Sequence, residues 1–140
     1  MQLNSLHLIH FKNHLSGDLK FGKQVNCLLG DNGSGKTNIL DALHYLCFCK
    51  SYFNPIDSQN ISHGEPFMMI KGVFNHHGNE EIVSCGVKKG QKKVFKRNEK
   101  VYPRLLEHIG RFPAVIIAPD DAEIIQGGGD VRRKWLDGVI

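Results

Sequence analysis

A run of residues near the start of the chain carries the residue types that could bind a triphosphate. They fit the phosphate-binding pattern G-x-x-x-x-G-K-[ST], in which glycines let the backbone curl around an anion without Cβ clashes. The helix that follows such a loop adds its unpaired N–H groups and the positive end of its dipole. In this pattern the lysine reaches the β- and γ-phosphates, and the final hydroxyl binds Mg²⁺. The predicted nucleotide-binding residues are Gly30, Asp31, Asn32, Gly33, Ser34, Gly35, Lys36 and Thr37.

The segments around this loop predict the strand and the helix that would position it. Residues 25–29 form an apolar run that indicates a buried strand. Residues 36–48 indicate a helix whose apolar face carries Ile39, Leu40, Leu43, Leu46 and Cys47. Alternating patterns at residues 6–11 and 18–21 predict strands before the loop, which favours an ATP-binding-cassette-like layout. The alternative is an ordinary glycine turn between a strand and a helix, and the context favours nucleotide binding.

The rest of the chain predicts a β-meander followed by short helices. Residues 50–66 are polar and interrupted by prolines, so we expect a surface loop or lid. Turn signals separate β-like runs at residues 67–74, 81–87 and 92–97. Beyond the meander, the patterns predict a short helix at residues 103–109, a buried strand at residues 112–118, and helices that begin at Pro119 and at Val131.

The composition limits the class of protein more than its activity. The chain has 140 residues and a formal net charge of +4, which is enough length for one domain with a hydrophobic core. Its 4 cysteines lack the spacing of a zinc site, so we expect small buried thiols in a reducing compartment. The chain does not open with a secretory signal pattern, and its longest apolar stretch is too short to span a bilayer. We therefore expect a cytoplasmic protein.

Nucleotide hydrolysis needs a carboxylate near Mg²⁺, usually at the end of a buried strand, in addition to the loop. The candidates are Asp120 and Asp121, which follow an apolar run but come directly after Pro119. They could form a Walker B pair, or they could be the cap and first turn of a helix. The intervening proline favours the helix cap.

Residues 88–104 are strongly basic, and Glu99 is the only acid among them. On a hairpin, half of these side chains would face one side, which suits contact with nucleic-acid phosphates. The alternative is a solvated edge strand whose lysines protect it against aggregation. The predicted DNA-binding residues are Lys88, Lys89, Lys92, Lys93, Lys96 and Arg97.

Several stretches of the chain resemble the RecF family and related SMC-like ATPases. Residues 6–14 resemble the L-x-L-x-N-F-R-N start of these proteins, and residues 30–42 are similar to their extended Walker A segment. Residues 118–137 resemble the RecF signature P-x-D-L-x-x-I-x-G-x-P-x-x-R-R-x-x-L-D. The first and second stretches are shared by SMC-like proteins, whereas the last is more specific to RecF.

This resemblance implies an ABC-type ATPase that binds DNA and dimerises around ATP. RecF proteins act with RecO and RecR to load the recombinase at single-strand gaps, in the response to DNA damage and in the maintenance of replication forks. By match to the motifs, residues 30–37 would contact ATP and Mg²⁺, and Lys12 and Asn13 would lie near the nucleotide. Lys12 stands where the family usually has arginine. Lysine keeps the positive charge but cannot make the bidentate contact of a guanidinium.

The predicted fold class is α/β: part of a P-loop ATPase head of ABC- or SMC-like type, beside an antiparallel β-meander. We expect residues 1–50 to hold strands, loop and helix, residues 67–102 the meander, and residues 103–140 helices and the RecF-like signature. The family's ABC signature and Walker B come later in sequence. We therefore expect the parent chain to continue past residue 140 and this part alone to hydrolyse little ATP. The alternatives are a self-contained P-loop kinase or GTPase, and a DNA-binding or scaffold module whose glycine loop is incidental.

Overall fold

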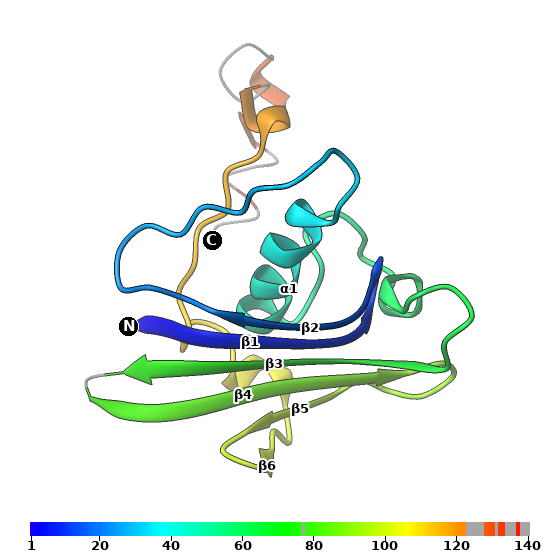
Figure 1. The fold of residues 1–140 in the computed structure, drawn as a ribbon, viewed down its shortest axis with the longest axis vertical. Helices are drawn as coiled ribbons and strands as arrows, with labels where there is room; N and C mark the ends of the chain where they lie inside the picture. The colour runs from blue at the N-terminus through cyan, green and yellow to red at the C-terminus, as the bar shows by residue number, and fades with distance from the viewer. Residues whose placement is uncertain (77, 123–127, 131, 134–136, 138–140) are drawn as a thin grey trace.

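A computed structural model describes residues 1–76, 78–122, 128–130, 132, 133 and 137 (Figure 1). It contains a 6-stranded antiparallel sheet of order β2-β1-β3-β4-β5-β6, with helix α1 lying across one face. The elements are β1 (Gln2–Phe11), β2 (His14–Lys20), α1 (Lys36–Phe48), η1 (Asp57–Asn60), β3 (Phe67–His76), β4 (Asn79–Lys88), β5 (Val94–Arg97), β6 (Lys100–Val101), η2 (Leu105–Glu107) and η3 (Pro119–Asp121). The η elements are short 3₁₀-helices.

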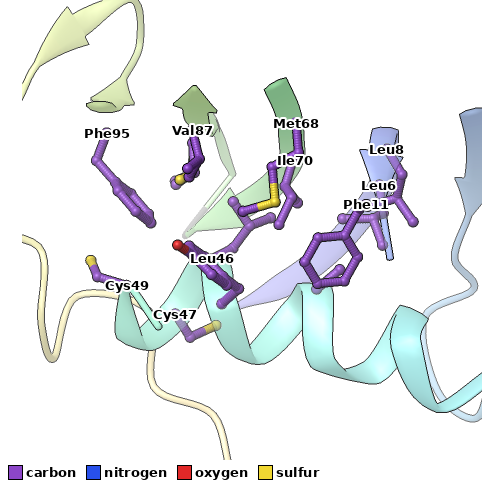
Figure 2. Close-up of a cluster of buried hydrophobic side chains, with 14 of the residues drawn as sticks. Leu6, Leu8, Phe11, Leu46, Cys47, Cys49, Met68, Ile70, Val87 and Phe95 are labelled. Carbon is purple, nitrogen blue, oxygen red and sulfur yellow. The ribbon is translucent and has the colours of Figure 1, made fainter. Parts of the chain in front are cut away.

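The hydrophobic core lies between α1 and the centre of the sheet. Successive strand residues point to opposite faces, so alternate positions on β1 and β3 meet the helix. Leu6 and Leu8 on β1 and Met68 and Ile70 on β3 are fully buried there, together with Leu46 from α1 (Figure 2). The strand pairing holds this arrangement, because Leu8 lies opposite Ile70 in the antiparallel register of β1 and β3.

Helix α1 buries a somewhat different face from the one its apolar residues predict. Ile39, Leu46 and Cys47 are buried as expected, but Leu40 is 46% exposed. Asp41, Ala42 and Tyr45 take the remaining buried positions. An amphipathic pattern does not predict the burial of an acid, and Asp41 is buried with ionic and hydrogen-bonding partners.

The strands predicted at residues 25–29 and 112–118 are wrong for this structure. Both segments run outside the sheet, and Leu29 and Val115 are 90% and 88% exposed. Cys27 is exposed for the same reason, whereas Cys47, Cys49 and Cys85 are buried as predicted. Apolar sequence indicates surface that favours burial, but a strand also needs a hydrogen-bonding neighbour. No strand in the described part of the chain pairs with either segment.

The remaining elements agree with the sequence in part. The predicted β-meander is confirmed as β3, β4 and β5. Residues 50–66 are not simply a surface loop, because Asn60 and Ile61 are buried and Ile61 bridges to Phe11 of β1. The helix predicted at residues 103–109 is reduced to η2, and the one from Val131 lies mostly outside the described residues. In the part that the structure describes, helices are too short or too polar to cross a bilayer.

His108 is fully buried and joins the end of the meander to α1. Its Nε2 donates a hydrogen bond to the Leu46 carbonyl oxygen at 2.6 Å. The ring stacks on Phe112 with centroids 5.2 Å apart and packs against Phe95 and Tyr102. Its Nδ1 is buried without a hydrogen-bond partner among the described residues, so protonation there would bury an unpaired N–H.

We expect His108 to make the protein less stable in mild acid. Burial lowers the pKa of His108, and the charge of Arg111 adds to this effect, although the bond to Leu46 opposes it. An unfolded histidine titrates near pH 6.5, so just below that pH the unfolded state binds more protons than the folded state. Stability is therefore full above about pH 6.5 and falls as the pH drops, by at most about 1.4 kcal/mol per pH unit for this proton.

The measurement is urea unfolding at several pH values between about 5 and 7.5. His108→Gln can still donate to the Leu46 carbonyl but cannot titrate, so its stability should depend less on pH than that of the wild type. An identical pH dependence in the two proteins would show that His108 does not contribute. Burial also lowers the pKa of His44, so the variant should retain a residual slope in the same direction.

Candidate nucleotide-binding site

The loop of residues 30–37, here called the P-loop, leads directly into the N-terminus of α1. Gly33 and Gly35 have φ of 82° and 96°, a left-handed conformation that strongly favours glycine. The N-cap of α1 is Gly35, and no side chain caps the helix. The first helical N–H groups are therefore free to bind an anion. A hollow of about 300 Å³ lies at this point, lined by Asn32, Gly33, Gly35, Lys36, Thr37 and Asn38.

Lys36 and Thr37 sit where the phosphate-binding pattern requires them. The Lys36 ammonium donates to the carbonyl oxygens of Gly30 and Asp31, each at 2.7 Å, and so folds over the P-loop. Thr37 is exposed in the first turn of α1, which contains no acidic residue. The hollow thus combines a lysine, a hydroxyl and a helix N-terminus without an opposing charge in that turn.

The turn between β1 and β2 contacts the P-loop from outside. Asn13 donates through Nδ2 to the Gly33 carbonyl at 3.2 Å, and His14 donates through Nε2 to the Gly35 carbonyl at 3.0 Å. Asn38 of α1 donates to Asn13 Oδ1 at 2.7 Å. The structure therefore brings Asn13 to the P-loop. Sequence reasoning missed His14, because nothing in a scattered set of histidines marks a contact across 21 residues.

Lys12 points to α1 in this structure. Its Nζ lies 2.6 Å from Oδ2 of Asp41, whose side chain is fully buried. Ser51 donates to Asp41 Oδ2 at 2.6 Å, and the Tyr52 backbone N–H donates to Oδ1 at 2.7 Å. One carboxylate thus ties together the end of β1, helix α1 and the segment after the helix. The Lys12 Nζ also lies 5.4 Å from the centre of the Phe53 ring.

Asp121 caps the short helix η3. Its Oδ2 accepts the Ala118 N–H at 2.7 Å, and its Oδ1 accepts the Tyr52 hydroxyl at 2.9 Å. These bonds support the helix-cap interpretation of Asp121 and occupy both carboxylate oxygens. The side chain of Asp120 lies outside what the structure describes. Among the described residues, no cluster of histidine, cysteine, aspartate and glutamate could hold a metal ion by itself.

The six residues predicted to bind DNA fall into two groups. Lys93 donates to the Cys49 carbonyl at 2.6 Å and pairs with Asp57 at 3.1 Å, so its ammonium is tied to the core. Arg97 forms a bidentate pair with Glu81, both bonds at 2.8 Å, which lowers the pKa of Glu81. The amino groups of the others make no ion pair or hydrogen bond within the described residues. These free lysines are Lys88, Lys89, Lys92 and Lys96.

Comparison with known proteins identifies the family. A family model described as an AAA domain matches residues 5–130. The DNA replication and repair protein RecF of Phocaeicola vulgatus is 50% identical over 141 residues, covering 100% of this chain and 38% of that protein. The chain therefore spans well under half the length of this curated relative.

Solved structures agree with the sequence matches. A structure of the recombination mediator protein RecF with ATP, from the RecFOR pathway, is 31% identical with a TM-score of 0.87, covering 97% of this chain and 37% of that one. The SMC head domain from Thermotoga maritima is 27% identical with a TM-score of 0.62, covering 76% of this chain and 40% of that one. The predicted fold class, part of an ABC- or SMC-like P-loop head, is confirmed. The chain belongs to the AAA domain family, and the resemblance to the RecF family that its motifs indicate is confirmed.

Proposed function

We propose that this chain binds ATP with Mg²⁺ through the P-loop and is the nucleotide-binding part of a RecF-like DNA repair protein. The carrying observation is the P-loop at the uncapped N-terminus of α1, with Lys36 folded over it. The hydroxyl of Thr37, exposed beside Lys36, fits the place of a Mg²⁺ ligand, and the bound ion would neutralise phosphate charge. The RecF relative solved with ATP supports this assignment.

For the whole protein we propose the wider activity of the RecF family. It would be a cytoplasmic ATPase that binds DNA, dimerises in response to ATP, and works with RecO- and RecR-like partners at single-strand gaps. Both carboxylate oxygens of Asp121 accept hydrogen bonds, from the Tyr52 hydroxyl and the Ala118 N–H. This supports our proposal that hydrolysis depends on residues outside this chain. Phosphoryl transfer by this chain alone would instead favour the kinase or GTPase alternative.

We further propose that DNA contact involves the free lysines and excludes Lys93 and Arg97. To bind a phosphate, an ammonium group must exchange its water contacts for phosphate oxygens, and this is easiest where no protein contact has to break. The four amino groups of the free lysines meet this condition, whereas the Lys93 ammonium and the Arg97 guanidinium are already paired. Binding through the free lysines would weaken steeply with salt, because each phosphate contact releases a counterion.

The test of ATP binding is calorimetry of the purified protein and of Lys36→Ala with ATP and Mg²⁺. A charge-assisted hydrogen bond contributes about 1.5–3 kcal/mol, so Lys36→Ala should weaken binding by about 10- to 150-fold. Lys50→Ala is the matched control, because Lys50 is exposed and follows the far end of α1. Equal affinities of wild type and Lys36→Ala would contradict the proposal, as would an absence of ATP binding.

A further inference from the structure

We propose that His14 is a positioning residue that fixes the P-loop for phosphate binding from outside the nucleotide site. The proposal rests on the proposed nucleotide function and assigns it a residue that lies outside the phosphate-binding motif. The contact that carries it is the hydrogen bond from His14 Nε2 to the Gly35 carbonyl, at 3.0 Å.

The geometry of the peptide unit explains how this bond acts on the ligand side. A trans peptide places its C=O and the following N–H on opposite sides of the chain. Holding the Gly35 carbonyl against His14 therefore aims the Lys36 N–H away from His14. This N–H belongs to the first residue of α1, where it has no partner within the helix. It is one of the donors that a bound phosphate would use.

The close approach of the β1–β2 turn leaves little freedom at Gly35. A Cβ at this position would come within 2.5 Å of both Asn13 Oδ1 and His14 Nε2. Asn38 holds Asn13 Oδ1, which turns the Asn13 amide nitrogen toward the Gly33 carbonyl. Two carbonyls of the P-loop are thus held by adjacent residues, Asn13 of the β1–β2 turn and His14 at the start of β2.

The turn is itself anchored, so it can act as a fixed support. Phe11 and His14 face each other as the closing pair of β1 and β2. The Lys12 backbone N–H donates to the Asn60 carbonyl at 2.8 Å, and Asn60 is fully buried. Through His14 and Asn13 the sheet therefore restrains the P-loop. In the described structure no paired strand leads directly into the P-loop to do so.

The experiment compares ATP affinity, by calorimetry, in the wild type, His14→Phe and His14→Gln. Phenylalanine removes the donor, and the loss of one hydrogen bond should weaken ATP binding by about three- to tenfold. Glutamine can place an amide N–H near the position of Nε2, so His14→Gln should recover most of the affinity. His63→Phe is the matched control, because His63 is an exposed histidine outside the P-loop hollow.

A second readout needs no nucleotide. The ¹³C resonance of the Gly35 carbonyl should move in His14→Phe and return toward the wild-type position in His14→Gln, with circular dichroism showing that both variants are folded. An unmoved Gly35 resonance, or unchanged ATP affinity in His14→Phe, would overturn the role of His14. Failure of the wild type to bind ATP would instead overturn the proposed function, while the Gly35 resonance would still report whether the contact exists.

Discussion

Replacing Asp41 by leucine is expected to destabilise the folded protein by about 3–5 kcal/mol, which is the usual cost of removing one partner from a buried ion pair. The substitution leaves the Lys12 ammonium without its carboxylate, and the Lys12 side chain is only 16% exposed. The Ser51 hydroxyl and the Tyr52 N–H lose their acceptor at the same time. Urea unfolding gives the loss directly.

The companion variants separate the ion pair from side-chain packing. Adding Lys12→Met to Asp41→Leu removes the unpaired charge, so the double variant should be more stable than Asp41→Leu alone. Glu80→Ala is the control, because Glu80 is an exposed acid at the start of β4. A loss in Asp41→Leu no larger than in Glu80→Ala would mean that Lys12 and Asp41 do not form a buried pair.

Charge reversal of Lys93 should cost about 2–4 kcal/mol of folding stability, since it places a second carboxylate beside Asp57 in a largely buried position. Lys93 is 19% exposed, and its ammonium also lies 5.5 Å from the centre of the Tyr45 ring. Tyr45 donates a hydrogen bond to the same Asp57 carboxylate. The substitution therefore disrupts the contact between β5, η1 and α1.

Charge reversal at three of the free lysines should instead leave folding stability unchanged and weaken DNA binding. Lys88, Lys89 and Lys92 are exposed, so replacing all three by glutamate should leave thermal unfolding nearly unchanged while sharply weakening DNA binding. Fluorescence anisotropy with labelled DNA over a salt series measures this, and the salt slope should fall with the lost phosphate contacts. Unchanged DNA affinity in the folded triple variant would show that these lysines only solvate the surface.

The local parts of this molecule could be predicted from its sequence. Glycine spacing identified the P-loop, apolar periodicity identified α1, and turn signals between β-like runs identified the meander, because each signal lies within a short window. The matching stretches at residues 6–14, 30–42 and 118–137 pointed to the RecF family, which the comparisons bear out.

The predictions that were wrong or missing concern features that depend on contacts between residues distant in sequence. Residues 25–29 look like a strand, but a strand forms only beside a neighbour, and none pairs with them in the described structure. Lys93 and Lys96 look equivalent in a basic run, yet only Lys93 meets Asp57, 36 residues away. The bond from His14 to Gly35 likewise depends on how the β1–β2 hairpin packs against α1, and no local pattern specifies that.

The most direct measurement of the central claim is a titration of ¹⁵N-labelled protein with ATP and Mg²⁺, followed by amide NMR. We expect the largest shifts on the backbone amides of residues 33–37, and we expect them to saturate. In Lys36→Ala the same shifts should need about 10- to 150-fold more ATP. Saturable shifts confined to other parts of the sheet, or a titration midpoint that is unchanged in Lys36→Ala, would contradict the P-loop as the nucleotide site.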